Sequence, residues 1–258
     1  MTDKLRLFVL PCVLMLGACA STEESSRVAY DPWEPLNRSV HEVNDVSDRF
    51  LLKPVAKGYE AVVPGFMRKG VTNFSRNLLT PGSAINNFLQ GKPRDGFSEI
   101  TRFLFNSTIG IAGLIDVSTI AGLDERHEDF GQTFAVWGVP DGPYVVLPFL
   151  GPKTLRDATA LPLDMLADPL WHYDDSSVRD PLNVLRIINL RANLLKLDNL
   201  IEDSKDPYVT IRESYLQNRN FEVYDGDPPV DDDFYDDFDD DFDDDFDEDF
   251  GDDDEDLN

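Results

Sequence analysis

The segment from residue 142 to residue 152, Gly-Pro-Tyr-Val-Val-Leu-Pro-Phe-Leu-Gly-Pro, places a short apolar run between glycines and prolines. Proline fixes φ and lacks an N–H, and glycine adopts conformations that other residues avoid. The segment is therefore predicted to follow a fixed, non-helical path. Only Tyr144 to Leu147 is expected to be extended, and four residues are too few to imply a substantial sheet.

On both sides of this segment, apolar residues recur with a helical period more often than they alternate. A mostly α-helical domain is therefore expected. Its helices are predicted to begin at Pro35, shortly before Phe66, near Arg94, at Pro181 and at Pro207.

Several details of these helices are also predicted. Pro81-Gly82 is expected to end the second helix, and Asp180 is expected to cap the helix that starts at Pro181. The buried stripe of that helix is predicted to consist of Leu182, Leu185, Ile188 and Leu195. The nearly apolar stretch from Ile109 to Ile115 suits either a protein core or contact with a membrane. It does not predict a transmembrane span, because no uncharged run after the signal reaches about 18 residues.

The N-terminus has the layout of a secretory signal: Lys4 and Arg6 precede an apolar run that leads to Leu16-Gly17-Ala18-Cys19. The last four residues resemble a bacterial lipobox. We therefore expect a lipoprotein signal peptide over residues 1–18 and a lipidated tether over residues 19–30. Cys19 would carry a diacylglycerol and an N-acyl chain, because stable anchoring needs more than one chain. By resemblance, Ala20 after the cysteine indicates the outer membrane.

The C-terminal segment from Asp225 to Asn258 contains 21 acidic residues and no basic one. A block of like charge is expected to stay disordered. The whole chain has a formal charge of −27. Without this segment, 29 acidic and 23 basic residues remain, so the rest of the chain is only mildly acidic. A globular domain is thus predicted over residues 31–224, followed by a disordered tail over residues 225–258. Nucleic acid is disfavoured as a partner, because phosphate contacts need an excess of Lys and Arg.

Few residues suggest catalysis or metal binding. The two cysteines are Cys12, within the signal, and Cys19, so the mature chain has no thiol ligand. The histidines lack a partner at the i+4 spacing of a helical zinc site. The triplet His127-Glu128-Asp129 is expected to form a solvated turn. No nucleophile elbow or phosphate-binding loop occurs. We therefore expect no catalytic residue, no metal site and no cofactor.

Several motifs in a fixed order resemble the MlaA lipoprotein family, also called VacJ. The segment 31–38 (DPWEPLNR) with Asn44 is similar to the family's opening, and the segment 142–157 is similar to its most characteristic region. Shorter motifs at 88–91, 101–103, 115–117, 129–133 and 206–208 follow in the same order. The resemblance covers residues 31 to 224 and leaves the Asp-rich tail out.

The resemblance implies a ring-like helical lipoprotein on the periplasmic side of the outer membrane, often beside trimeric porins. Phospholipids that have strayed into the outer leaflet would pass through its amphipathic channel to a soluble periplasmic carrier of the MlaC type. Candidate channel-shaping residues are Asn44, Gly142, Pro143, Tyr144, Pro148, Gly151 and Pro152. For the segment 142–152, a rigid surface turn remains an equal alternative.

Two other functions remain in competition with a channel. One is a structural lipoprotein that braces porins without moving lipid. The other is a lipid-degrading enzyme. A channel predicts extra phospholipid in the outer leaflet when the protein is deleted, a brace predicts altered envelope mechanics with intact asymmetry, and an enzyme predicts release of fatty acid or lysolipid.

Overall fold

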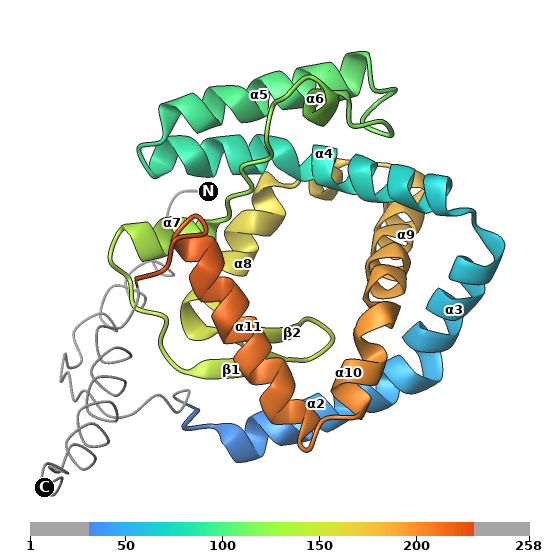
Figure 1. Ribbon diagram of the computed structural model, residues 1–258, viewed down its shortest axis with the longest axis vertical. Helices are drawn as coiled ribbons and strands as arrows, with labels where there is room; N and C mark the ends of the chain where they lie inside the picture. Colours follow the sequence, from blue (N-terminus) through green and yellow to red (C-terminus); the bar gives the residue numbers. More distant parts are fainter. Residues whose placement is uncertain (1–30, 230–258) are drawn as a thin grey trace, which may run out of the picture.

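The computed structural model describes residues 31–229, which form a ring of helices around an open centre (Figure 1). The elements are α2 (Glu34–Ser47), the π-helix η1 (Asp48–Leu52), α3 (Lys53–Val62), α4 (Gly65–Leu89), α5 (Pro93–Thr108), α6 (Val117–Ile120), α7 (Phe130–Val136), β1 (Tyr144–Leu147), β2 (Gly151–Thr154), α8 (Leu155–Ala167), the 3-10 helix η2 (Pro169–His172), α9 (Ser176–Leu194), η3 (Leu195–Leu197), α10 (Asp198–Glu202) and α11 (Pro207–Val223). The predicted mostly helical, ring-like domain is confirmed. The signal peptide, Cys19 and most of the acidic tail lie outside the described residues.

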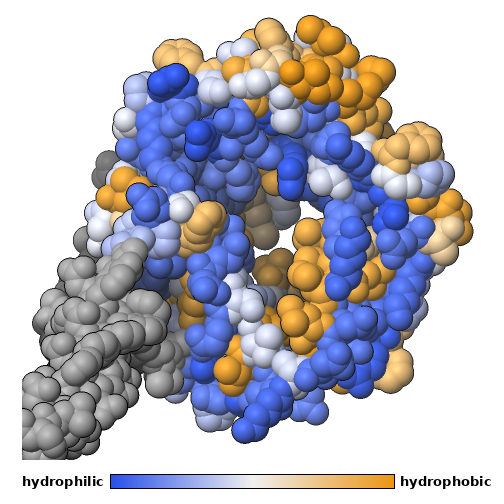
Figure 2. All heavy atoms as spheres, in the orientation of Figure 1, coloured by the Kyte–Doolittle hydropathy of each residue, from blue (hydrophilic) through white to orange (hydrophobic). Residues whose placement is uncertain are grey.

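The ring is built by consecutive elements that follow its circumference. Helices α2 and α3 form two sides, α4 forms a third, and the hairpin β1–β2 with α8 and α11 closes the fourth (Figure 1). Helix α9 lies inside α3, and α5 packs on the outside of α4. The space-filling view confirms an opening through the centre that side chains do not fill (Figure 2).

The bend between α2 and α3 coincides with the π-helix Asp48–Leu52. The backbone N–H of Lys53 donates to the carbonyl of Asp48, one residue further back than in an α-helix. Pro54 follows directly and has no N–H to donate. Widened turns of this kind often occur at functional sites. Here the π-helix carries Asp48 and leads into Lys53, both of which face the ring's interior.

The distribution of polarity is the reverse of that in a water-soluble domain. Among residues 31–229, nineteen fully buried residues are polar or charged and only eight are apolar or aromatic. Large apolar side chains lie on the outside instead, and Phe50, Phe66 and Ile120 are each 78 to 80% exposed. Figure 2 shows such residues gathered on the rim. Extensive exposed apolar surface marks contact with another protein or with lipid.

The apolar stretch 109–115 follows this pattern. It forms the turn after α5, and Ile109, Ile111, Leu114 and Ile115 are 44 to 66% exposed. Burial in an ordinary core, one of the two expectations, is therefore wrong. Within residues 31–229, no single helix has the length and apolar character needed to cross a membrane.

The predicted stop at Pro81-Gly82 is wrong, because α4 continues through both residues to Leu89. Packing of α4 along α5 outweighs the hydrogen bond that Pro81 removes. Gly82 has a different role. A Cβ atom there would lie 3.1 Å from the Cβ of Ala167, so glycine permits the close approach of α4 and the end of α8.

The predicted start of the helix at Pro181 is also wrong. Helix α9 begins at Ser176, and Asp175 caps it by accepting a hydrogen bond from the N–H of Ser177 at 2.9 Å. Its predicted stripe is only half-buried. The starts expected at Pro35, near Arg94 and at Pro207 agree with α2, α5 and α11 to within one residue.

The extended segment Tyr144–Leu147 is confirmed, but it has a partner that the sequence did not suggest. Strand β1 pairs antiparallel with β2, with Tyr144 opposite Thr154 and Leu147 opposite Gly151. Gly151 and Pro152, for which only a fixed, non-helical path is expected, lie within β2. Both strands of a two-stranded hairpin are edges, where proline is tolerated.

Candidate functional site

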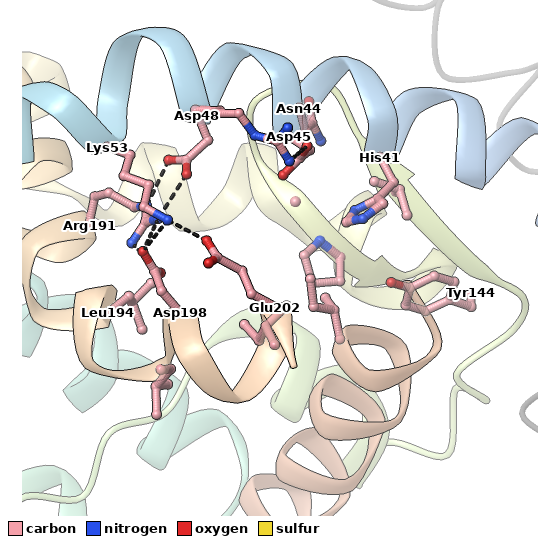
Figure 3. Close-up of a pocket in the computed structure, with 17 residues that line it drawn as sticks. His41, Asn44, Asp45, Asp48, Lys53, Tyr144, Arg191, Leu194, Asp198 and Glu202 are labelled. Carbon is pink, nitrogen blue, oxygen red and sulfur yellow. Dashed lines mark hydrogen bonds and ion pairs between the residues drawn. The ribbon is translucent and has the colours of Figure 1, made fainter. Parts of the chain in front are cut away.

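A cavity of about 300 Å³ opens into the ring between α2, the hairpin β1–β2, α9, α10 and α11 (Figure 3). Its lining divides into two kinds of surface. Charged and polar groups come mainly from α2, η1, α3 and one face of α9 and α10. Apolar groups complete the wall, and they are Val146, Pro152, Leu194, Leu197, Ile201 and Ile211. The cavity is therefore amphipathic.

The charged part of the wall is one connected ion network. Arg191 holds both carboxylate oxygens of Asp48, at 2.7 and 2.8 Å, and contacts Asp198 at 3.0 Å. Lys53 contacts Asp198 at 2.9 Å and also donates to Glu202. Figure 3 shows these five side chains converging on the cavity. Because two cations meet three carboxylates, one carboxylate charge remains in excess.

Hydrogen bonds within this network stabilise the charged forms of Lys53 and Asp198. The hydrogen bonds that the Lys53 ammonium donates to the carboxylates of Glu202 and Asp198 raise the pKa of Lys53 above its ordinary value. Partial burial alone would raise the pKa of Asp198, but the hydrogen bonds from Arg191 and Lys53 outweigh it and hold that pKa below its usual range. The contacts between Lys53 and Asp198 therefore favour the charged form of both side chains.

Two asparagines of α2 bind the free edge of β1. The Asn37 side chain donates to the Tyr144 carbonyl and accepts from the Val146 N–H, both at 2.9 Å. Asn44, two helical turns further along the same face, donates to the Leu147 carbonyl at 3.0 Å and accepts from the Phe149 N–H at 2.8 Å. The two side-chain amides make the backbone hydrogen bonds that a neighbouring strand would otherwise make, so α2 holds the hairpin at the edge of the cavity.

Replacing Asn37 by leucine is expected to cost about 3 kcal/mol of unfolding free energy, whereas Asn44→Leu should cost about 1 kcal/mol. Both changes remove two hydrogen bonds to the hairpin. Asn37 is 3% exposed, so its backbone partners would stay buried and unpaired, whereas the turn at Phe149, 76% exposed, is open to water. Thermal unfolding in detergent measures both variants. Equal losses would contradict this interpretation of the two contacts.

The first and last described segments are joined by charged side chains. Asp31 accepts hydrogen bonds from Asn37, Tyr208 and Arg212. Arg38 contacts Asp206, the cap of α11, at 2.8 Å. The motifs at 31–38 and 206–208 are therefore neighbours in space, and their polar residues close the ring.

A second buried network joins α11 to α7 and α8. Arg219 contacts Asp129 at 2.7 Å and Asp157 at 3.0 Å, and the side chains of Arg219 and Asp157 are 8% and 4% exposed. The hydroxyl of Tyr215 also donates to Asp157, at 2.7 Å. Burial would raise the pKa of Asp157, but the charge and hydrogen bonds of Arg219 hold it below its ordinary value.

The predicted site residues separate into two groups. Asn44, Tyr144, Gly151 and Pro152 line the cavity, whereas Gly142, Pro143 and Pro148 do not. Gly142 and Gly151 have φ values of +67° and +76°, which agrees with the backbone path expected of them. The members of the ion network were missed. They are scattered over residues 48–202 with no common spacing, so only the fold brings them together.

The expected solvated turn at 127–129 is wrong for Glu128, which is 5% exposed. Its carboxylate accepts from the side chains of Gln90 at 2.8 Å and Lys92 at 3.1 Å. Asp129 caps α7. Over the described part of the chain, no group of three or more His, Cys, Asp or Glu side chains is arranged to hold a metal ion.

The elements of the ring pack through buried polar residues, large apolar side chains lie on the rim, and the cavity that opens into the ring is amphipathic. These features define a class of helical ring proteins suited to contact with lipid. Residues 29–222 match the model of the MlaA lipoprotein family, so the chain belongs to this family.

Several known proteins are similar to the chain. The intermembrane phospholipid transport system lipoprotein MlaA of Escherichia coli (strain K12) is 39% identical over 228 residues, covering 84% of this chain and 88% of the relative. Its counterpart in Haemophilus influenzae is 32% identical over 232 residues, covering 88% and 93%. A solved structure from work on the structural basis for maintenance of bacterial outer membrane lipid asymmetry is 38% identical, with a TM-score of 0.66 over 75% of this chain and 98% of that one.

Proposed function

We propose that the protein is a phospholipid translocation channel, which removes misplaced phospholipids from the outer leaflet of the outer membrane and passes them to a periplasmic carrier. The observation that carries this proposal is the opening through the ring, which offers charged groups on one part of its wall and apolar groups on the other. Relatives named for intermembrane phospholipid transport support the same function.

The apolar path for acyl chains is proposed to run along α9. The side chains of Val184, Ile187, Leu190 and Leu194 form one stripe and are 44 to 61% exposed. The opposite face of α9 holds the buried residues Asn189 and Ala192, and Asn189 accepts from the Tyr59 hydroxyl of α3 at 3.1 Å. Because α3 lies outside α9, the apolar stripe faces the opening.

The headgroup is proposed to occupy the cavity beside the ion network. A volume of about 300 Å³ lies at the lower end of pockets that hold drug-sized ligands. It suits a headgroup and the adjoining glycerol, while the two acyl chains would extend along the open ring. The hairpin β1–β2, with Gly142 and Pro143 before it and Pro148 in its turn, is proposed to shape this entrance.

The apolar rim is proposed to lie among lipids and Cys19 to carry the anchor. The Cys19→Ser variant should not be acylated, because a hydroxyl cannot form the thioether. We expect most of it to leave the outer-membrane fraction, because the apolar rim alone would hold the protein less firmly than the rim together with covalent lipid chains. Fractionation and mass spectrometry measure this. A variant that stays in the outer membrane in normal amount would contradict the anchor.

The proposed partners are phospholipids, a soluble periplasmic lipid carrier and, at the apolar rim, trimeric porins. The alternative, a lipoprotein that braces porins without moving lipid, would use the same rim. It does not account for the charged groups that face the cavity, since a brace has no use for an amphipathic opening.

The Asp-rich tail is proposed to lie in the periplasm, because unpaired carboxylates are too costly to place in an apolar medium. Asp225 contacts Lys92 at 2.7 Å, so a truncation should follow Pro229 rather than Tyr224. We expect the truncated protein to fold, remain in the membrane and move lipid, with a changed and less salt-dependent rate of carrier association. Stopped-flow binding at several salt concentrations measures the rate, and failure to fold or insert would contradict an independent tail.

The direct test of transport is transfer from proteoliposomes to the carrier. Vesicles containing the purified, lipidated protein and a fluorescent phospholipid are mixed with the soluble carrier. The carrier should acquire the fluorescent lipid faster than from vesicles without the protein. Equal transfer rates would oppose a channel, and release of lysolipid would instead support an enzyme.

A further inference from the structure

The side chains of Lys53 and Glu202 form a charge pair that is only partly satisfied. The Lys53 ammonium has three N–H donors and uses two of them, for Asp198 and Glu202. One oxygen of Glu202 binds Lys53, and the other accepts no hydrogen bond within residues 31–229. The Glu202 side chain is 63% exposed, and both residues line the cavity. One donor and one acceptor thus remain side by side.

The charge around this pair is unbalanced. All charged groups of the lining count four carboxylates, Asp45, Asp48, Asp198 and Glu202, against the three cations Arg49, Lys53 and Arg191. Asp45 and Arg49 pair with each other at 2.9 Å, so the excess negative charge belongs to the network that contains Glu202. A ligand that brings only negative charge would meet repulsion here, whereas an ammonium group would be attracted.

We infer that the ring binds zwitterionic phospholipids with a primary amine, such as phosphatidylethanolamine, more tightly than anionic ones such as phosphatidylglycerol. The side chains of Lys53 and Glu202 bind the headgroup and determine this preference. This inference rests on the proposed function. In phosphatidylethanolamine two carbons separate the phosphate ester from the nitrogen, so its two charges are close neighbours. The phosphate would accept from the free donor of Lys53, and the ammonium would donate to the free oxygen of Glu202. The two charge pairs would then lie antiparallel, with every charge beside its opposite.

The test uses the purified, full-length, lipidated protein in detergent and two short-chain probes, dihexanoyl-phosphatidylethanolamine and dihexanoyl-phosphatidylglycerol. Calorimetric titration gives the ratio of their dissociation constants. For the wild type we expect the dissociation constant of the ethanolamine lipid to be about fivefold lower. This ratio is the upper end of what a solvent-accessible ion pair contributes to binding. Glu202→Gln should bring the ratio close to one, and Glu202→Lys should reverse it.

Asp203→Asn is the matched control, because Asp203 neighbours Glu202 on the chain, is exposed and does not line the cavity. It removes the same charge and should keep the wild-type ratio. Equal affinities of the wild type for both probes, or an unchanged ratio in Glu202→Gln, would overturn the headgroup preference and leave the channel intact. Binding of neither probe would oppose the channel as well. Unchanged helicity and melting temperature of each variant show that the ratio reports on binding.

Discussion

Replacing Gly131 by alanine is expected to lower the free energy of unfolding by about 3 kcal/mol. A Cβ atom at this position would lie 2.3 Å from Oδ1 of Asp157 and 2.5 Å from a guanidinium nitrogen of Arg219. Those two groups hold each other at 3.0 Å in a buried network, so neither can move without breaking its contacts. Breaking a buried ion pair typically costs about 3 to 5 kcal/mol, part of which small shifts would recover. Thermal unfolding of the purified protein measures the loss.

Gly58→Ala is the matched control. Gly58 also lies within a helix, α3, but a Cβ atom there would meet no atom within 4 Å. Alanine favours a helix over glycine by about 1 kcal/mol, so Gly58→Ala should be neutral or slightly stabilising. If both variants were equally stable, the packing of α7 against α8 and α11 would not depend on the space at Gly131.

Replacing Leu194 by tryptophan is expected to slow transfer of phospholipid from proteoliposomes to the carrier by about tenfold. Leu194 lies where the α9 stripe meets the cavity and is 44% exposed. The larger indole would fill part of the opening without disturbing a packed core. A tenfold lower rate corresponds to an activation free energy raised by about 1.4 kcal/mol, which is a small increase for a side chain that narrows the opening.

The control for this variant is Leu104→Trp. Leu104 is 53% exposed and belongs to α5, which lies on the outside of α4 and away from the opening (Figure 1). The two variants add the same side chain at similar exposure, so only the position differs. Equal transfer rates for Leu194→Trp and Leu104→Trp would contradict passage of lipid along α9.

Helix type and several helix starts could be predicted from local residues. Pro207 and its capping Asp206 mark α11 because both act within one turn. The course of α4 through Pro81 could not be predicted, because packing on α5 outweighs the local signal for a break. Strand β2 was missed for a related reason: the hairpin is stabilised by Asn37 and Asn44, which lie more than 100 residues earlier in the chain.

The candidate site was predicted less completely than the fold. Asn44 and Tyr144 belong to motifs that are visible in the sequence, and both line the cavity. Asp48, Arg191 and Glu202 carry no such signal, since charged residues on helices are usually solvated. The exposure of the apolar faces could not be predicted from the sequence either, because a periodic apolar stripe looks the same whether it packs on a protein core or contacts lipid.

The measurement that tests the channel most directly is the amount of phospholipid in the outer leaflet of the outer membrane. It would be compared among the parent strain, a deletion strain and the deletion strain expressing either the wild type or Leu194→Trp at equal abundance. A channel predicts that deletion raises outer-leaflet phospholipid, that the wild type restores the parental level and that Leu194→Trp restores it only in part. An unchanged outer leaflet after deletion, with altered envelope mechanics alone, would contradict lipid translocation and support a structural brace.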